Sequence, residues 1–267
     1  MLYSCGLLFD AHTHLLPDRL ALAIRSFVAR AQPALVLAYP PAADEARAAL
    51  VRAGVQRCVS LPYAHKGGIA LALNRDMAER WRGDPVVIAG ATVHPEDDVA
   101  AVVAQACDVL GARVFKLHCS VGGYEPDDPR LDPLYARELP VVIHVGHAVD
   151  GSTAAGEPER VVEVARRWPR TPLVIAHFGA PAVEAAEAVM RACPNVHADL
   201  APILWEPPRL TRGLIRGLEE RILFGSDVPT VKVRVEEGLQ QVRDLHLGAE
   251  AEAAILGGNA ARLYGGA

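Results

Sequence analysis

The side chains best suited to chemistry in this sequence lie at the ends of short apolar runs. His12 and His14 follow the first such run and are two residues apart, so on a strand both imidazoles would share a face and could bind one ion. Three later apolar runs also end in a potential metal ligand, namely His144, His177 and Asp227. A lone His-x-His pair is a weak signal, but the repetition of this arrangement predicts a metal-dependent enzyme.

The types of these residues indicate which metal chemistry to expect. His12, His14, His144 and Asp227 would supply three nitrogens and one carboxylate, a set suited to Zn²⁺ or another first-row divalent ion with one position left for water. Such an ion lowers the pKa of bound water and polarises a substrate oxygen, and Asp227 could accept the water's proton. The alternative is that these histidines are structural groups hydrogen-bonded to the backbone.

A further pair of polar residues interrupts an apolar segment. Lys116 and His118 would share the inward face of a strand, and lysine is scarce here, since the 27 basic residues include only three lysines. We therefore expect both to lie on the substrate side of the site or to support the metal ligands.

Several loop residues are weaker candidates. His94 and His147 follow predicted strands and could line the mouth of the site, although a hydrogen bond within a loop explains His94 equally well. Cys119 is one of five widely spaced cysteines without a C-x-x-C pair, and a packing role is the expectation for it.

The elements that must position these side chains alternate along the chain. Apolar, β-type runs are predicted as strands over Leu7–Asp10, Val55–Leu61, Val86–Thr92, Arg113–His118, Val141–His144, Leu173–His177, Val196–Leu200 and Ile222–Phe224. Helical periodicity is predicted over Asp44–Ala53, Ile69–Arg82, Glu96–Leu110, Glu157–Arg167, Pro181–Ala192, Arg209–Leu218 and Val235–Leu245. Eight strands in βα units predict a (β/α)₈ TIM barrel, a single α/β domain over residues 1–267. An open doubly wound sheet is the rival, but it would not readily bring ligands from the first, fifth, sixth and last strands together.

Composition excludes several other classes of protein. The chain has 267 residues, 51% hydrophobic and 22% charged, which is typical of a folded protein with a large core. The net charge of -5 and scattered arginines disfavour a nucleic-acid partner and favour a small-molecule substrate. No signal peptide or membrane span is evident near the N-terminus, so we expect a cytoplasmic protein. A homo-oligomer is possible.

The order of these motifs resembles the amidohydrolase superfamily, in particular its amidohydrolase-2 branch, which includes proteins similar to aminocarboxymuconate-semialdehyde decarboxylase. The motifs that carry the resemblance are His12-Thr13-His14, His144, His177, Gly225-Ser226-Asp227 and the closing Gly258-Asn259-Ala260-Ala261-Arg262-Leu263-Tyr264. The resemblance covers the chain almost end to end. It implies a metal-centred (β/α)₈ barrel with ligands His12, His14, His144 and Asp227, and a catalytic or substrate-polarising His177.

The resemblance leaves the number of ions open. Some members of the superfamily carry a carboxylated lysine that bridges two metals, a position that Lys116 resembles. In the amidohydrolase-2 branch, a Lys-Leu-His segment commonly accompanies one metal, with the lysine lining the pocket. We favour one ion, with two if Lys116 is carboxylated.

The predicted activity is hydrolysis of an amide, ester or lactone bond of a small substrate by metal-activated water, with Asp227 and His177 as catalytic residues. One alternative is a metal-dependent lyase that removes CO₂ from a small carboxylic acid without oxidation. Another is a metal-binding barrel without catalytic activity.

Overall fold

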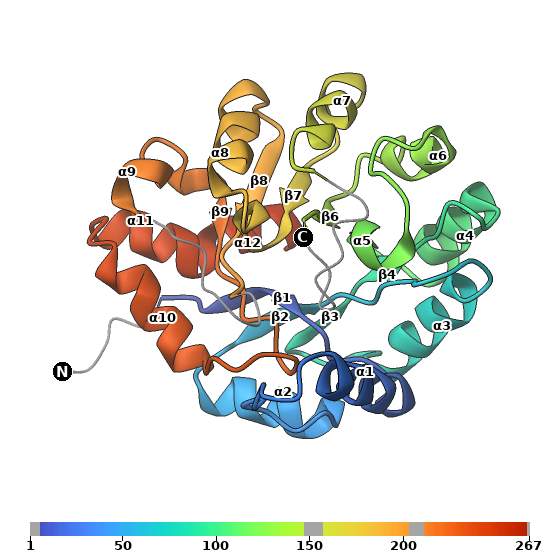
Figure 1. The fold of residues 1–267 in the computed structure, drawn as a ribbon, viewed down its shortest axis with the longest axis horizontal. Helices are drawn as coiled ribbons and strands as arrows, with labels where there is room; N and C mark the ends of the chain where they lie inside the picture. Colours follow the sequence, from blue (N-terminus) through green and yellow to red (C-terminus); the bar gives the residue numbers. More distant parts are fainter. Residues whose placement is uncertain (1–5, 147–156, 203–210, 266–267) are drawn as a thin grey trace.

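The computed structural model describes residues 6–146, 157–202 and 211–265, and these form a ring of parallel strands surrounded by helices (Figure 1). The strands are β1 (Phe9–Thr13), β2 (Arg57–Ser60), β3 (Val87–Ala89), β4 (Ala91–Thr92), β5 (Phe115–His118), β6 (Val141–His144), β7 (Leu173–Ile175), β8 (Val196–Asp199) and β9 (Ile222–Leu223). Their hydrogen-bonded order follows the chain, in the two sets β1-β2-β3 and β4 through β9. The predicted strand Val86–Thr92 is thus divided between β3 and β4.

Backbone hydrogen bonds join the two sets into a barrel. At the division between β3 and β4, the Gly90 N–H donates to the Ser60 carbonyl, and the Ala91 N–H donates to the Val114 carbonyl. One segment therefore pairs with β2 on one side and β5 on the other. At the opposite junction, the Ala11 N–H donates to the Phe224 carbonyl at 2.8 Å, so the first strand meets the last. The predicted TIM barrel is confirmed.

The helices occupy the connections between strands. The larger ones are α1 (Asp18–Ala31), α2 (Ala43–Arg52), α3 (Ala70–Arg80), α4 (Val99–Ala104), α7 (Arg160–Arg167), α8 (Val183–Ala192), α10 (Val235–Asp244), α11 (Ala249–Ala253) and α12 (Asn259–Tyr264). Three helices have four residues each: α5 (Cys119–Gly122), α6 (Asp132–Tyr135) and α9 (Arg212–Ile215). Helix α4 continues as a π-helical segment over Gln105–Val109. The sequence did not predict α1, and only part of the helix expected over Arg209–Leu218 forms among the described residues.

Two apolar layers hold the barrel together. The inner layer contains Phe9, Val59, Val142 and Val174, and α12 contributes Tyr264, whose ring lies 6.2 Å from that of Phe9. Helix α12 lies over the centre of the ring in Figure 1 and closes the amino-terminal end of the barrel. The outer layer packs the other strand faces against the helices. The opposite end, where the strands give way to loops, therefore holds the polar side chains.

A β-bulge in β1 decides which of its side chains enter the barrel. Asp10 pairs with Cys58 and Thr13 with Ser60, so β1 has one more residue than β2 over this stretch. Within the bulge, Ala11 belongs to the inner apolar layer, and His12 also lies inside the barrel although it is the next residue. The strand thus begins later and extends further than the predicted Leu7–Asp10, and it includes His12.

Candidate metal centre

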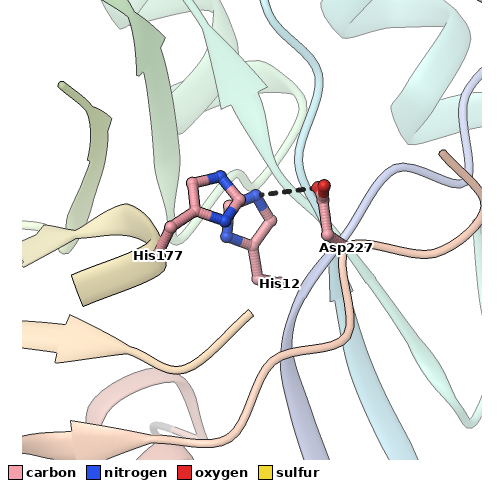
Figure 2. Close-up of side chains that lie close together, drawn as sticks. All are labelled: His12, His177 and Asp227. Atoms are coloured by element: carbon pink, nitrogen blue, oxygen red, sulfur yellow. Dashed lines mark ion pairs between the residues drawn. The ribbon is translucent and has the colours of Figure 1, made fainter. Parts of the chain in front are cut away.

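Three of the predicted metal ligands converge at the carboxyl end of the barrel. His12 lies in β1, His14 follows it, and Asp227 follows β9. His12 Nε2 lies 3.3 Å from His14 Nε2 and 3.6 Å from Asp227 Oδ1, and His14 Nε2 lies 3.0 Å from the same oxygen. All three residues are buried, and Figure 2 shows the His12 and Asp227 side chains pointing toward each other. The first and last strands therefore share one polar cluster.

Neighbouring acceptors fix the ring orientation of both histidines. His12 Nδ1 donates to Asp199 Oδ2 at 2.9 Å, and His14 Nδ1 donates to the Leu61 carbonyl at 2.6 Å. In the neutral imidazole, a proton on Nδ1 leaves a lone pair on Nε2. Both Nε2 atoms then face each other and the Asp227 carboxylate as acceptors, an arrangement that a cation stabilises.

The spacing of these acceptors fits a tetrahedral ion. With zinc–nitrogen and zinc–oxygen distances of about 2.0–2.2 Å, two ligands of a tetrahedral zinc are about 3.3–3.6 Å apart. His12 Nε2 lies within this range of both partners, at 3.3 Å from His14 Nε2 and 3.6 Å from Asp227 Oδ1, while the latter two atoms are slightly closer, at 3.0 Å. The residues present therefore fit a divalent metal by donor type and burial, and His12 also by its spacing.

Charges in the site agree with the roles of ligand and acceptor. Burial lowers the pKa of His12 to about 3 and also lowers the pKa of His177, so both imidazoles are neutral near pH 7. Burial alone would raise the pKa of Asp227, but its interactions with the His14, His177 and His12 rings outweigh burial and hold that pKa below its ordinary value. Asp227 is therefore ionised at neutral pH.

The backbone that carries Asp227 is held in an unusual conformation. Asp227 has a φ of 58°, and its N–H donates to the His12 carbonyl at 2.8 Å. The preceding Ser226 donates from its N–H to Asp10 Oδ1 at 3.0 Å and from its hydroxyl to Asp10 Oδ2 at 2.5 Å. Asp10 Oδ1 also accepts the His12 N–H at 3.1 Å, within the bulge of β1. Asp10 thus ties the His12 segment to the Asp227 segment.

His144 and His177 form a second pair beside this cluster. His177 Nδ1 donates to the Ala201 carbonyl at 3.1 Å, so its Nε2 accepts from His144 Nδ1, also at 3.1 Å. His144 then has its lone pair on Nε2, the same proton arrangement as His12 and His14. One ligand atom each from His12, His177 and Asp227 lies within 4.8 Å of the others, so His177 is also a ligand candidate by position (Figure 2). His177 lies beyond the end of β7, in a turn with φ 55°, so the predicted strand Leu173–His177 is two residues too long.

Lys116 and His118 line the site from β5. Lys116 is fully buried, and its Nζ lies 3.1 Å from His12 Nε2, while burial lowers its pKa to about 8. The His118 ring stacks on that of His144 with centroids 3.9 Å apart, and Ser120 Oγ lies 3.3 Å from His118 Nδ1. The His118 ring also contacts that of Tyr63, whose ring meets His14 edge-on. These residues form one wall of the site.

The remaining candidates lie elsewhere. His94 donates from Nε2 to the Gly122 carbonyl at 3.1 Å and accepts the Glu96 N–H at Nδ1, so its contacts match the loop hydrogen-bond alternative. Cys119 is buried, and burial raises its thiol pKa, as expected for a packing role. His147 lies outside the described residues.

Asp199, at the end of β8, is a site residue that the sequence analysis missed. One of its oxygens bonds to His12, and the other accepts the N–H groups of His177 and Ala201. Burial opposes its ionisation, but the electrostatic interaction and the hydrogen bond with the His12 ring outweigh burial and hold the pKa of Asp199 well below its ordinary value. Its position at a strand end, shared with the predicted ligands, was the available signal.

A parallel βα barrel with clustered histidines and aspartates at the carboxyl ends of its strands defines the class of protein. The family model described as Amidohydrolase matches residues 9–266, and the chain belongs to this family. Among the described residues, no helix has both the length and the apolar character needed to cross a membrane.

Individual relatives extend the comparison. The chain is 26% identical over 249 residues to L-fucono-1,5-lactonase of Burkholderia ambifaria, covering 80% of this chain and 82% of the relative. An uncharacterized TIM-barrel protein from Bordetella bronchiseptica superimposes with a TM-score of 0.75 at 22% identity, covering 96% of this chain and 97% of its own. The 5-carboxyvanillate decarboxylase LigW from Sphingomonas paucimobilis gives 0.68 at 16% identity, with coverages of 97% and 98%. At these identities, the two structures support the fold alone.

Proposed function

We propose that this amidohydrolase is a metal-dependent hydrolase that opens a lactone, ester or amide bond of a small substrate, with a lactone first among these. The observation that carries the proposal is the convergence of His12 Nε2, His14 Nε2 and Asp227 Oδ1 at 3.0–3.6 Å from one another. The similarity to a lactonase supports the choice of bond.

His12, His14 and Asp227 would hold one divalent ion, expected to be zinc, and His144 would add a ligand through Nε2. The His144 Nδ1–H donates a hydrogen bond to His177 Nε2. Metal-binding histidines typically donate a hydrogen bond from the ring nitrogen that does not bind the metal. When bound, the ion would supply a water of lowered pKa and a positive charge that polarises the substrate carbonyl.

Asp227 would act as the proton acceptor for the attacking water. It is ionised at neutral pH, and two backbone hydrogen bonds, from the Asp227 N–H to the His12 carbonyl and from the Ser226 N–H to Asp10, hold the carboxylate at the cluster. After attack, the same carboxyl group could pass its proton to the leaving oxygen, which is the general acid step of hydrolysis.

His177 would orient the substrate and share the handling of protons. Its Nδ1 is bonded to the Ala201 carbonyl, which leaves Nε2 as its exchangeable position, in contact with His144. A neutral imidazole at this position can accept one proton at Nε2 and release it to the product. His118 and Tyr63 would flank the substrate with aromatic surface and keep water away from that side.

The proposal is tested by combining metal analysis with a substrate panel. We expect about one zinc per chain, proton release with ring opening on sugar lactones, and loss of turnover after chelation that added zinc restores. Two zincs per chain would instead indicate a carboxylated Lys116.

Other outcomes would support the alternatives. Release of CO₂ from aromatic carboxylic acids, with no proton release from lactones or anilides, would replace hydrolysis by decarboxylation. Bound zinc without turnover across lactones, anilides and carboxylic acids would favour a barrel that binds metal without catalysis. The panel should therefore include all three substrate classes in the same preparation of protein.

A further inference from the structure

Asp199 uses both of its carboxylate oxygens on residues of the site. Oδ2 accepts His12 Nδ1 at 2.9 Å, while Oδ1 accepts the His177 N–H at 2.9 Å and the Ala201 N–H at 3.1 Å. The residue is fully buried at the end of β8. One side chain therefore connects a ring from β1 with the backbone that follows β7.

The contact with His12 determines where that ring carries its proton. A carboxylate has no hydrogen to donate, so His12 must donate from Nδ1, and its lone pair must lie on Nε2. Nε2 is the atom that faces His14, Lys116 and Asp227. If His12 held its proton on Nε2 instead, an N–H bond would occupy the point where His12 Nε2, His14 Nε2 and Asp227 Oδ1 meet.

The contact with His177 holds a backbone conformation that L-residues rarely adopt. His177 has φ 55° and Phe178 has φ 49°, so two consecutive residues lie in the left-handed region. Asp199 accepts the His177 N–H, and Ala201, held by the same carboxylate, accepts the ring proton of His177 through its carbonyl. Backbone and ring of His177 are thus fixed by one short segment, residues 199–201.

We propose that Asp199 is a positioning residue that sets the proton of His12 on Nδ1, so that Nε2 can bind the metal, and that anchors His177 beside it. This inference rests on the proposed metal centre, but its first test does not require turnover. Asp199 acts through His12 and His177 and is not itself assigned a contact with metal or substrate.

Asp199→Asn separates the two tasks of the carboxylate. The amide oxygen must stay with the His177 and Ala201 N–H groups, because turning the amide would place its NH₂ group against two donors. The NH₂ group then faces His12 Nδ1 and forces that nitrogen to accept, which moves the His12 proton to Nε2. We expect the anchoring of His177 to survive and the His12 proton to change position.

Asp84→Asn is the matched control. Asp84 Oδ1 accepts the Val86 and Val87 N–H groups at 2.8 and 2.9 Å, and its Oδ2 pairs with Arg47 Nε at 2.8 Å. The substitution removes one charge and one acceptor in the same way, but away from the metal centre. A general cost of replacing a carboxylate that accepts two backbone N–H groups would therefore appear in both variants.

The first measurement is the proton position on His12 in zinc-free protein with ¹⁵N-labelled histidine, its signals assigned by their loss in His12→Gln. We expect Nδ1–H in the unsubstituted protein and in Asp84→Asn, and Nε2–H in Asp199→Asn. Nε2–H in the unsubstituted protein would overturn the proposal, and this holds even if Asp199→Asn fails to fold. The measurement also decides the question if the protein binds no zinc, a result that would count against the proposed function alone.

The second measurement is zinc affinity by competition with a chelating dye. We expect Asp199→Asn to weaken zinc binding about 10–100-fold, as loss of a group that orients a ligand typically does. In the His12→Gln background, the same substitution should change affinity by a much smaller factor, because its target ring is gone. An equal loss with and without His12, or an equal loss in Asp84→Asn, would contradict positioning through His12.

Discussion

The two halves of the site hold their imidazoles in different ways. In the half formed by β1 and β9, oxygen acceptors fix His12 and His14, at Asp199 and the Leu61 carbonyl. In the half formed by β6 and β7, His144 bonds to another imidazole, that of His177. The first half presents lone pairs fixed by oxygen acceptors, whereas in the second the His144 N–H is held by the lone pair of another imidazole, His177 Nε2, which can itself take up a proton.

This difference assigns separate tasks to the two halves. An ion needs ligands whose protons are kept away from it, which carboxylate and carbonyl acceptors achieve because they never donate. A step that moves protons needs a ring that can both accept and release one near neutral pH. The β1 and β9 half therefore suits metal binding, and the β6 and β7 half combines the proposed ligand His144 with His177, which suits contact with the substrate.

The largest expected effect comes from Asp227→Asn in the metal-binding half. The amide keeps the size of the side chain but loses its negative charge and its ability to accept the proton of water. We expect turnover to fall about 10²–10⁴-fold, as typical for loss of a general base, together with weaker zinc binding. The measurements are steady-state kinetics on the best lactone of the panel and zinc competition.

Asp244→Asn is a suitable control for this variant, because Asp244 lies on the surface at the end of α10 and bonds to Gln240. It should leave both quantities unchanged. If Asp227→Asn retained full turnover, the metal-binding half would not contain the proton acceptor, and the division between the halves would be wrong.

The next effect in size is expected from replacing one of the proposed histidine ligands, His14 or His144. We expect His14→Gln to weaken zinc binding by more than the 10–100-fold typical of a residue that only supports a ligand. His144→Gln should have a similar effect if its Nε2 binds the ion, as the sequence predicts. The exposed His246, after α10, provides the same substitution as a control.

Measuring turnover and zinc affinity for the same variant then shows whether His144 binds the ion or acts through His177. If His144→Gln lowered turnover while zinc affinity stayed near that of the control, His144 would act through His177, and the β6 and β7 half would contain no ligand. Loss of zinc binding in His177→Gln would instead place His177 among the ligands, in line with its position within 4.8 Å of His12 and Asp227.

Much of the molecule could be predicted because strand ends are visible in the sequence. Buried parallel strands read as apolar runs, and a polar residue directly after such a run lies at the carboxyl end of the barrel. This reasoning located the segments of His12, Lys116, His144 and Asp227 correctly. A similar rule applied to Asp199 would have added it, since it is the last polar residue of the predicted strand Val196–Leu200 and ends β8 in the structure.

Other features depend on contacts that no local pattern reveals. The bulge in β1 places Ala11 and His12 on the same side of the strand, against the usual alternation, and its backbone is held by a hydrogen bond from the His12 N–H to the Asp10 side chain and by pairing with Phe224. The left-handed backbone of His177 depends on Asp199 in the next strand. Both arise from residues distant in sequence, so they become visible only in the folded chain.

The smallest effect on the site is expected from Asp10→Asn, which contrasts with Asp199→Asn although both residues bond to His12. Asp10 contacts the His12 backbone rather than its ring, and an amide can keep its contacts by accepting the His12 and Ser226 N–H groups and donating to the Ser226 hydroxyl. Burial raises the pKa of Asp10 to about 7 from 3.8. At neutral pH the native site therefore already tolerates a proton on this side chain, and we expect zinc affinity and turnover close to those of the unsubstituted protein.

The raised pKa also gives this variant a signature in stability. Between the unfolded value of 3.8 and the folded value of about 7, the folded chain keeps a proton on Asp10 that the unfolded chain has released. Stability from this group is therefore complete below pH 4 and falls as pH rises, at up to about 1.4 kcal/mol per pH unit, and the asparagine variant lacks this dependence. Urea unfolding of zinc-free protein across this range should show the variant gaining on the unsubstituted protein as pH rises. Parallel curves would mean that Asp10 titrates alike in both states, and a large loss of zinc affinity would mean that the bulge needs a charged carboxylate.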